Sequence, residues 1–103
     1  MSVIKVVLEE EIDRLERKVF SYEKLLSTLP RGTIFIRKMG NVSYAYRKRK
    51  ENGKVISIYL GNIEKDDIKK EIELSNDYKR VKNNLRVTKK ELIKLKKAIK
   101  SYE

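Results

Sequence analysis

The hydrophobic residues of the first thirty positions recur at alternating spacings of four and three. This is the a/d pattern of a heptad repeat, and it predicts an amphipathic helix with one continuous apolar seam. The seam consists of Leu8, Ile12, Leu15, Val19, Tyr22, Leu26 and Leu29. Pro30 disfavours the helical conformation of the residue before it, so we expect the helix to span residues 2–29.

From Thr33 the spacing of hydrophobic residues changes to two, which is typical of strands. Three runs rich in isoleucine, valine and aromatic residues follow one another: Thr33–Lys38, Val42–Arg49 and Lys54–Leu60. An Asn-Gly pair between alternating runs is the strongest short-range hairpin signal, and Asn52-Gly53 separates the last two runs. The sequence therefore predicts a three-stranded antiparallel meander over residues 33–60.

The register of this sheet decides which side chains share a face, because a shift of one residue reverses every position. A two-residue turn at Asn52-Gly53 would place Tyr44, Tyr46, Val55 and Tyr59 together. A three-residue loop with a bulge at Gly53 gathers a larger apolar face: Ile34, Ile36, Tyr44, Tyr46, Ile56, Ile58 and Leu60. We expect this second register, with a three-residue loop at Met39–Asn41. The opposite face then carries Phe35, Arg37, Ala45, Arg47, Arg49, Ser57 and Tyr59.

A second long helix is expected over residues 63–102, capped by Asn62 or Asp66. Its C-terminal part repeats a regular seam: Tyr78, Val81, Leu85, Thr88, Leu92, Leu95, Ile99 and Tyr102. Ile68, Ile72 and Leu74 do not fit that frame, and residues 75–77 (Ser-Asn-Asp) lie where the two frames meet. The mismatch indicates either a heptad stutter or a true helix break, and the sequence leaves both open.

These elements predict an α+β fold in one domain of residues 1–103, with its two helices pairing as an antiparallel coiled coil. At 1.5 Å per residue the first helix is roughly 40 Å long and an unbroken second helix roughly 58 Å. About a dozen residues of seam would then lack an intramolecular partner, around Leu92, Leu95 and Ile99. Exposed apolar stripes of this kind mark interfaces, so we expect a homodimer through these residues, unless a break at residues 75–77 lets residues 78–102 fold back on the first helix.

Composition narrows the chemistry of the chain. It contains no cysteine and no histidine, which excludes Cys/His zinc sites, thiol nucleophiles and Ser-His-Asp triads. The Asp66-Asp67 pair fits the first turn of a helix, where acidic groups favour the helix dipole. We therefore assign no catalytic residue, metal ligand or cofactor, and expect a binding protein. Without a signal-peptide pattern or an apolar span, we expect it in the cytoplasm and not at a membrane.

The formal net charge is +11, and most of the excess lies in the predicted sheet, where residues 30–60 hold eight basic side chains and one acidic one. Basic groups pair with phosphates and aromatic rings stack on bases, so this composition suits nucleic acid, with DNA favoured over RNA. The candidate binding residues are Arg37, Arg47, Lys48, Arg49, Lys50, Lys54 and Tyr59. The alternative is a solvated sheet whose basic residues protect its edges from aggregation.

Three motifs also resemble a known group of proteins: the segments 29–34 (LPRGTI), 44–47 (YAYR) and 52–61 (NGKVISIYLG). They resemble small uncharacterised proteins of low-GC Gram-positive bacteria and their phages, which carry such a sheet between charged helices. A more distant similarity is to the arm-binding domains of tyrosine integrases. That similarity implies a three-stranded sheet that contacts DNA and is backed by a following helix.

A different class of function fits the same sequence. The chain would then be a coiled-coil protein–protein interaction module, such as a prefoldin-like clamp or a phage-encoded inhibitor of a host nucleoprotein. Its basic face would meet an acidic protein surface. Salt-dependent binding of generic DNA distinguishes the nucleic-acid hypothesis from this one.

Overall fold

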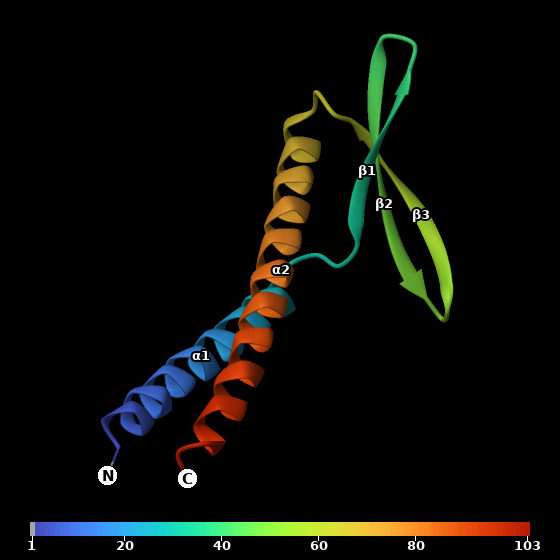
Figure 1. The fold of residues 1–103 in the computed structure, drawn as a ribbon. Helices are drawn as coiled ribbons and strands as arrows, with labels where there is room; N and C mark the ends of the chain where they lie inside the picture. The colour runs from blue at the N-terminus through green and yellow to red at the C-terminus, as the bar shows by residue number, and fades with distance from the viewer. Residues whose placement is uncertain (1) are drawn as a thin grey trace. The chain divides into compact units, whose positions relative to one another are not determined.

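The computed structural model describes residues 2–103 and contains a helix, a three-stranded sheet and a second helix (Figure 1). The elements are α1 (Val3–Thr28), β1 (Thr33–Met39), β2 (Val42–Glu51), β3 (Lys54–Asn62) and α2 (Asp66–Lys100). The sheet is an antiparallel meander in the order β1-β2-β3. The predicted α+β class and the order of its elements are confirmed. Over the described residues, no helix is both long and apolar enough to cross a membrane.

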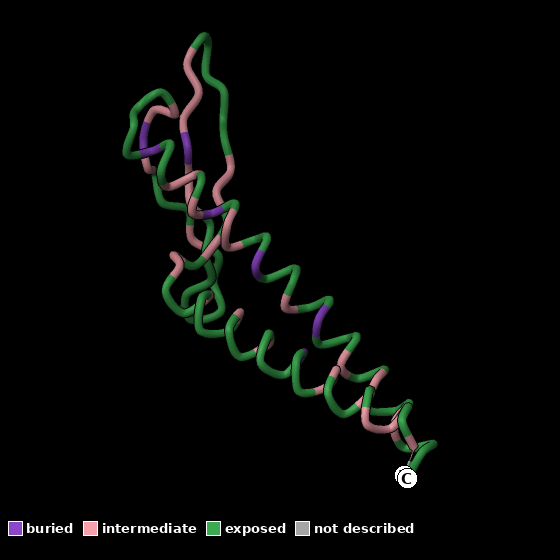
Figure 2. The backbone as a smooth tube through the Cα atoms, turned by 90° about the vertical axis from the view of Figure 1, so that its left-hand side faces the viewer, coloured by how far each residue is buried: buried purple, intermediate pink, exposed green. Residues whose placement is uncertain are grey.

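The chain forms two compact units, and α2 contributes one half to each of them. The helical unit consists of residues 1–28 and 81–103, and the sheet unit consists of residues 29–80. Most of the described residues in both units are exposed, and the few buried residues are spread along the helices and the centre of the sheet (Figure 2). Each unit therefore has a small core of its own.

In the helical unit, α1 runs antiparallel to the C-terminal half of α2, with the two chain ends at the same end of the pair (Figure 1). Leu15 is almost fully buried, and the other predicted seam positions of α1 are half-buried. Glu16 and Lys96 form an ion pair of 3.4 Å between the helices. Val81 and Thr88 are the buried positions of α2 in this unit. The heptad pattern thus identified the buried side of both helices.

The C-terminal seam of α2 belongs to the helical unit, together with α1. Leu92, Leu95 and Ile99 are half-buried within the helical unit, and Leu95 lines a surface pocket together with Leu15 of α1. From the helix lengths, α1 was expected to pair with the beginning of α2. In the structure, that beginning belongs to the sheet unit, so α1 meets the second half. Leu95 therefore lies beside α1 within the chain, and the homodimer expected through these residues stays a prediction.

The register also differs from the expectation. Both hairpins have two-residue turns, because Met39 pairs with Val42 and Glu51 pairs with Lys54. Asn52 and Gly53 both have positive φ angles, 51° and 78°, as a tight hairpin turn of this kind requires. The pairing of β2 with β3 then shifts by one residue between Ala45 and Tyr46. The irregularity expected at Gly53 therefore lies inside the sheet.

The side of the sheet that faces α2 is set by contacts with residues 66–80. Ala45 is fully buried at the centre of the sheet, and Gly61 is buried against Ile68. A Cβ at position 61 would make an ordinary contact of 3.4 Å with the Ile68 side chain, and glycine is favoured here by its φ angle of 142°, which side-chain-bearing residues rarely adopt. The backbone N–H of Ile34 donates to the Ser75 hydroxyl at 3.3 Å. We call this side the helix-facing side.

Helix α2 is continuous through residues 75–77, so the frame mismatch is not a break. Ser75 is buried and accepts a hydrogen bond from β1, whereas Asn76 is exposed. The frame changes because the two halves of α2 pack against different elements. The N-cap of α2 is Lys65, whose carbonyl accepts a hydrogen bond from the Lys69 N–H, so neither Asn62 nor Asp66 occupies that position. The Asn62 side chain accepts a hydrogen bond from the Glu64 N–H in the turn before the helix.

Candidate nucleic-acid interface

The side of the sheet opposite the helix-facing side carries a cluster of aromatic and basic side chains. Residues paired across strands project to the same side, so the register places Phe35, Tyr46 and Tyr59 in one row across β1, β2 and β3. We call this surface the aromatic–basic face. It consists of Phe35, Arg37, Tyr44, Tyr46, Lys48, Lys50 and Tyr59.

The aromatic rings of this face contact one another. Phe35 and Tyr46 stack with their ring centroids 5.2 Å apart and an interplanar angle of 16°. Tyr59 meets Tyr46 edge to face at 5.5 Å and lies 5.9 Å from Tyr44. Aromatic pairs at these separations contribute about 0.5–1.5 kcal/mol beyond their burial. The cluster therefore gives the open side of the sheet a defined apolar surface of its own.

Basic side chains lie on either side of the aromatic row along the strand direction. Lys48, two residues after Tyr46, places its ammonium 4.8 Å from the centre of the Phe35 ring. Arg37, two residues after Phe35, places its guanidinium 5.9 Å from the centre of the Tyr46 ring. Within the three strands, no acidic side chain belongs to this face. Its electrostatic potential is therefore positive on both sides of the row.

The structure divides the seven predicted site residues between the two sides of the sheet. Arg37, Lys48, Lys50 and Tyr59 belong to the aromatic–basic face, and all four are exposed. Arg47, Arg49 and Lys54 belong to the helix-facing side. The expected grouping of Arg47 and Arg49 with Phe35, Arg37 and Tyr59 was therefore wrong. Because both hairpins have two-residue turns, the pairing differs by one residue from that expected for three-residue loops, and Arg47 and Arg49 lie on the opposite side of the sheet from Phe35.

The two arginines on the helix-facing side are engaged in ion pairs. Arg47 is mostly buried and its guanidinium lies 2.5 Å from a carboxylate oxygen of Glu71 on α2. Arg49 pairs at 2.6 Å with Glu51 on its own strand, and both of these side chains are largely exposed. Arg47 thus ties β2 to α2, and its charge is already balanced by a carboxylate.

Sequence reasoning missed three members of the face, Phe35, Tyr44 and Tyr46, as binding candidates. The signal that finds them was present in the chain. If Asn52-Gly53 is assumed to form a two-residue turn, Tyr44, Tyr46 and Tyr59 lie on the same side of the sheet. The preference for the largest apolar face outweighed that turn signal.

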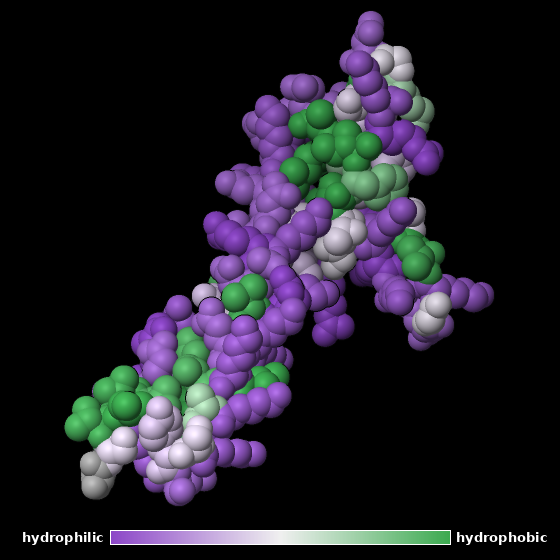
Figure 3. All heavy atoms as spheres, viewed as in Figure 1, coloured by the Kyte–Doolittle hydropathy of each residue, from purple (hydrophilic) through white to green (hydrophobic). Residues whose placement is uncertain are grey.

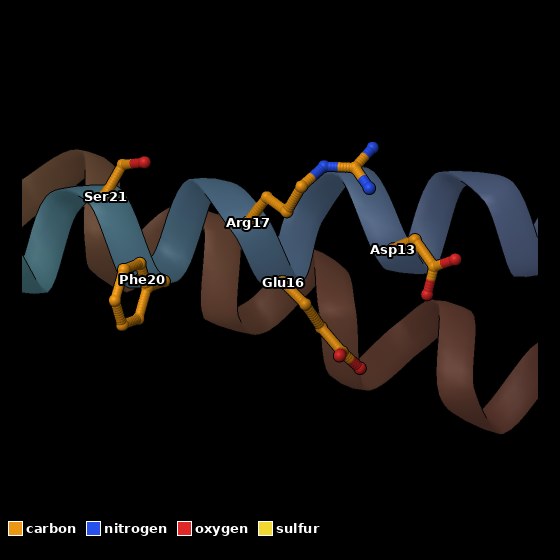
Figure 4. A pocket seen from close by; sticks show the side chains of 5 residues that line it. All are labelled: Asp13, Glu16, Arg17, Phe20 and Ser21. Carbon is orange, nitrogen blue, oxygen red and sulfur yellow. The ribbon is translucent and has the colours of Figure 1, made fainter.

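Elsewhere in the molecule, Asp13, Glu16, Arg17, Phe20 and Ser21 of α1 line a surface pocket (Figure 4). Glu16 is engaged with Lys96, and Phe20 is 70% exposed. Among the described residues, no group of three or more acidic side chains is placed to hold a metal ion. Polar and charged residues dominate the surface in Figure 3, with apolar groups gathered on the sheet unit and near the start of α1. The aromatic–basic face remains the best-defined candidate site.

Comparison with known proteins identifies a family to which the chain is similar. No curated protein and no solved structure is significantly similar to the chain. A family model described as a domain of unknown function, DUF6788, matches residues 7–70. The match includes most of α1, all three strands and the first residues of α2, which is more than half of the sequence and contains the whole aromatic–basic face. The chain therefore belongs to the DUF6788 family.

Proposed function

We propose that this protein binds nucleic acid, without catalysing a reaction, through the aromatic–basic face of its sheet. The observation that carries the proposal is the row of Phe35, Tyr46 and Tyr59 with basic side chains on both sides of it. Phosphate oxygens are bound by lysine and arginine, and bases offer π-faces to aromatic rings. A sheet that presents both kinds of group on one side suits a ligand that contains both.

The distribution of charge supports this face over the rest of the basic surface. Lys48 and Lys50 occupy alternate positions of β2 and are exposed, whereas the arginines between and beside them face the other way. Arg47 and Arg49 are paired with carboxylates, which reduces their value to a phosphate ligand. Within β2, the basic side chains without a carboxylate partner therefore lie on the side that also carries the rings.

The test exploits this alternation along one strand. Fluorescence anisotropy with a labelled oligonucleotide at low salt measures affinity, and repeating it over a range of salt concentrations gives the slope of log K against log salt. Lys48→Ala with Lys50→Ala should weaken binding and lower the magnitude of that slope by about 1.5, since each lost phosphate contact contributes about 0.7–0.9. Circular dichroism should remain unchanged because both side chains are exposed.

Two control variants remove the same charge from other places. Arg49→Ala with Lys54→Ala acts on the helix-facing side of the same hairpin, and Lys94→Ala with Lys97→Ala acts on exposed positions of α2. Both should retain most of the affinity. Equal losses in all three variants would show that binding follows total charge and that the face is not the site. No affinity of the wild-type protein for DNA or RNA at low salt would refute the proposal and favour an acidic protein partner instead.

A further inference from the structure

We infer that the ligand of the aromatic–basic face is a single strand, one of whose unpaired bases stacks on the exposed ring of Tyr59 at the end of the row formed by Phe35, Tyr46 and Tyr59. This inference rests on the proposed function and specifies the form of nucleic acid that the site accepts. It depends on the geometry of the rings, whereas the proposed function depends on the presence of cations beside them.

The arrangement of the rings excludes a good fit to a duplex. The three rings come from three adjacent strands, which are about 4.8 Å apart; Phe35 and Tyr46 stack on each other, and Tyr59 meets Tyr46 edge to face. A duplex conceals the π-faces of its bases within its own stack and offers only base edges and backbone to a protein. A single strand can turn its bases outward and place them on aromatic side chains. Aromatic rings on the open side of a sheet can therefore stack on the bases of a single strand but not on those of a duplex.

Tyr59 is the most accessible platform in the row. Its side chain is 57% exposed, whereas Phe35 and Tyr46 are half-buried and stack on each other. The Lys48 ammonium lies over Phe35, and the Arg37 guanidinium lies over Tyr46. A base can therefore stack directly on Tyr59, while the cations above its neighbours are placed to meet the phosphates on either side of that base.

Tyr44 fixes the orientation of this platform. Its ring lies 5.9 Å from Tyr59 at an interplanar angle of 47°, and Tyr46, also on β2, contacts Tyr59 with the ring centroids 5.5 Å apart. A side chain held by two neighbours loses less rotational freedom when a ligand binds, which favours affinity. The phenol hydroxyl is not needed for stacking, so phenylalanine at position 59 should preserve the function of the platform.

The experiment compares four labelled ligands of about a dozen nucleotides at one low salt concentration: oligo(dT), oligo(U), an abasic strand of equal length, and a duplex. Wild-type protein should bind a base-containing single strand at least about tenfold more tightly than the abasic strand or the duplex. Tyr59→Ala should weaken single-strand binding by about 5- to 100-fold, leave the abasic strand unaffected, and preserve the salt slope. Tyr59→Phe should restore the affinity.

Matched controls separate stacking from damage to the fold. Tyr102→Ala removes another partly exposed tyrosine, in the helical unit, and should change nothing. Tyr59→Leu keeps an apolar side chain without a ring, so it should lose single-strand affinity while retaining the wild-type melting temperature. A preference for oligo(dT) or for oligo(U) identifies DNA or RNA as the source of the strand, and either supports the inference.

The results also distinguish failure of this inference from failure of the proposed function. If the abasic strand or the duplex binds as tightly as oligo(dT) and oligo(U), stacking is wrong while binding by the basic side chains stands. If none of the four ligands binds at low salt, the proposed function itself is wrong. If Tyr59→Leu binds single strands like the wild-type protein, the ring of Tyr59 is not the platform.

Discussion

At the scale of single residues, the neighbours Arg47 and Lys48 show how one strand separates structural from binding roles. Both are basic, yet Arg47 is held against α2 by Glu71 and Lys48 is exposed above the Phe35 ring. The alternation of a strand assigns them to opposite sides of the sheet. Equal charge therefore predicts different effects of substitution at the two positions.

We predict that Arg47→Ala lowers the free energy of unfolding by about 1–2 kcal/mol, because it removes a mostly buried, charge-assisted hydrogen bond and leaves Glu71 without that partner. Arg49→Ala should change it by no more than about 0.5 kcal/mol, since the Arg49–Glu51 pair is largely exposed. Urea denaturation of both variants, with a double-mutant cycle to Glu71→Gln, measures the difference. A cost of Arg47→Ala no larger than that of Arg49→Ala would contradict a structural role for the pair.

A second residue-scale prediction concerns Glu11. A hydrogen bond from Arg14 lowers the pKa of the Glu11 carboxyl below its ordinary value, and the charges of Arg14 and Lys18 add to this effect. Because the pKa is lower in the folded state, the contribution to stability is present above the unfolded-state pKa and is lost as pH falls through the folded-state pKa. NMR titration should show the Glu11 midpoint rising in Arg14→Ala. An unchanged midpoint would mean that the pair does not form in solution.

At the scale of elements, α2 serves two different packing partners without interrupting its backbone. Ile68 and Ser75 are its buried positions toward the sheet, and Val81 and Thr88 are its buried positions in the helical unit. A helix with one partner would keep a single frame throughout. The change of frame at residues 75–77 therefore reflects a change of partner, and the polar Ser75 fits because it accepts the Ile34 N–H.

Substitutions at Asn76 test the continuity of α2. The residue is exposed within the helix, so Asn76→Ala should raise the free energy of unfolding by about 0.5 kcal/mol through helix propensity. Asn76→Pro should lower it by about 3 kcal/mol, because proline removes a helical hydrogen bond and clashes with the preceding turn. Thermal denaturation followed by circular dichroism measures both. At a true helix break, Asn76→Ala would instead lower the free energy of unfolding by removing a cap, and Asn76→Pro would be tolerated.

At the scale of the whole molecule, the chain builds two small cores that share α2. The helical unit buries Leu15, Val81 and Thr88, and the sheet unit buries Ala45, Gly61, Ile68 and Ser75. With so few buried side chains, each unit depends on half-buried seam contacts for much of its stability. The C-terminal seam is therefore needed inside the chain, whatever it contributes to association between chains.

We predict that Leu95→Ala lowers stability by about 1–2 kcal/mol, since the side chain is half-buried near Leu15. The loss in melting temperature should be the same at every protein concentration, as an intramolecular contact requires. Differential scanning calorimetry over a wide concentration range, with exposed Lys94→Ala as the control, provides the measurement. A dimer through this seam would instead be supported if the wild-type melting temperature rises with protein concentration and the loss in Leu95→Ala becomes smaller on dilution.

The sequence by itself determined what depends on local periodicity. The heptad spacing located both helices and their buried sides, the alternation located the three strands, and Pro30 placed the end of α1 within a residue of its position at Thr28. These features follow from the repeat of each backbone conformation, so a few neighbouring residues specify them.

Only the tertiary structure decided the sides of the sheet and the partner of each helix half. Both registers bury some apolar residues, and a difference of one residue in a turn decides between them, so the choice depends on packing against α2. From the sequence alone, the aromatic rings could lie on either side of the sheet. In the structure they stack on one another on the side away from α2, while Ala45 and Ile68 are buried on the helix-facing side. In the same way, the C-terminal seam has the same spacing whether it meets α1 or a second copy. In the structure α1 and the C-terminal half of α2 form one unit, while the first half of α2 contacts the sheet, where the Ile34 N–H donates to the Ser75 hydroxyl.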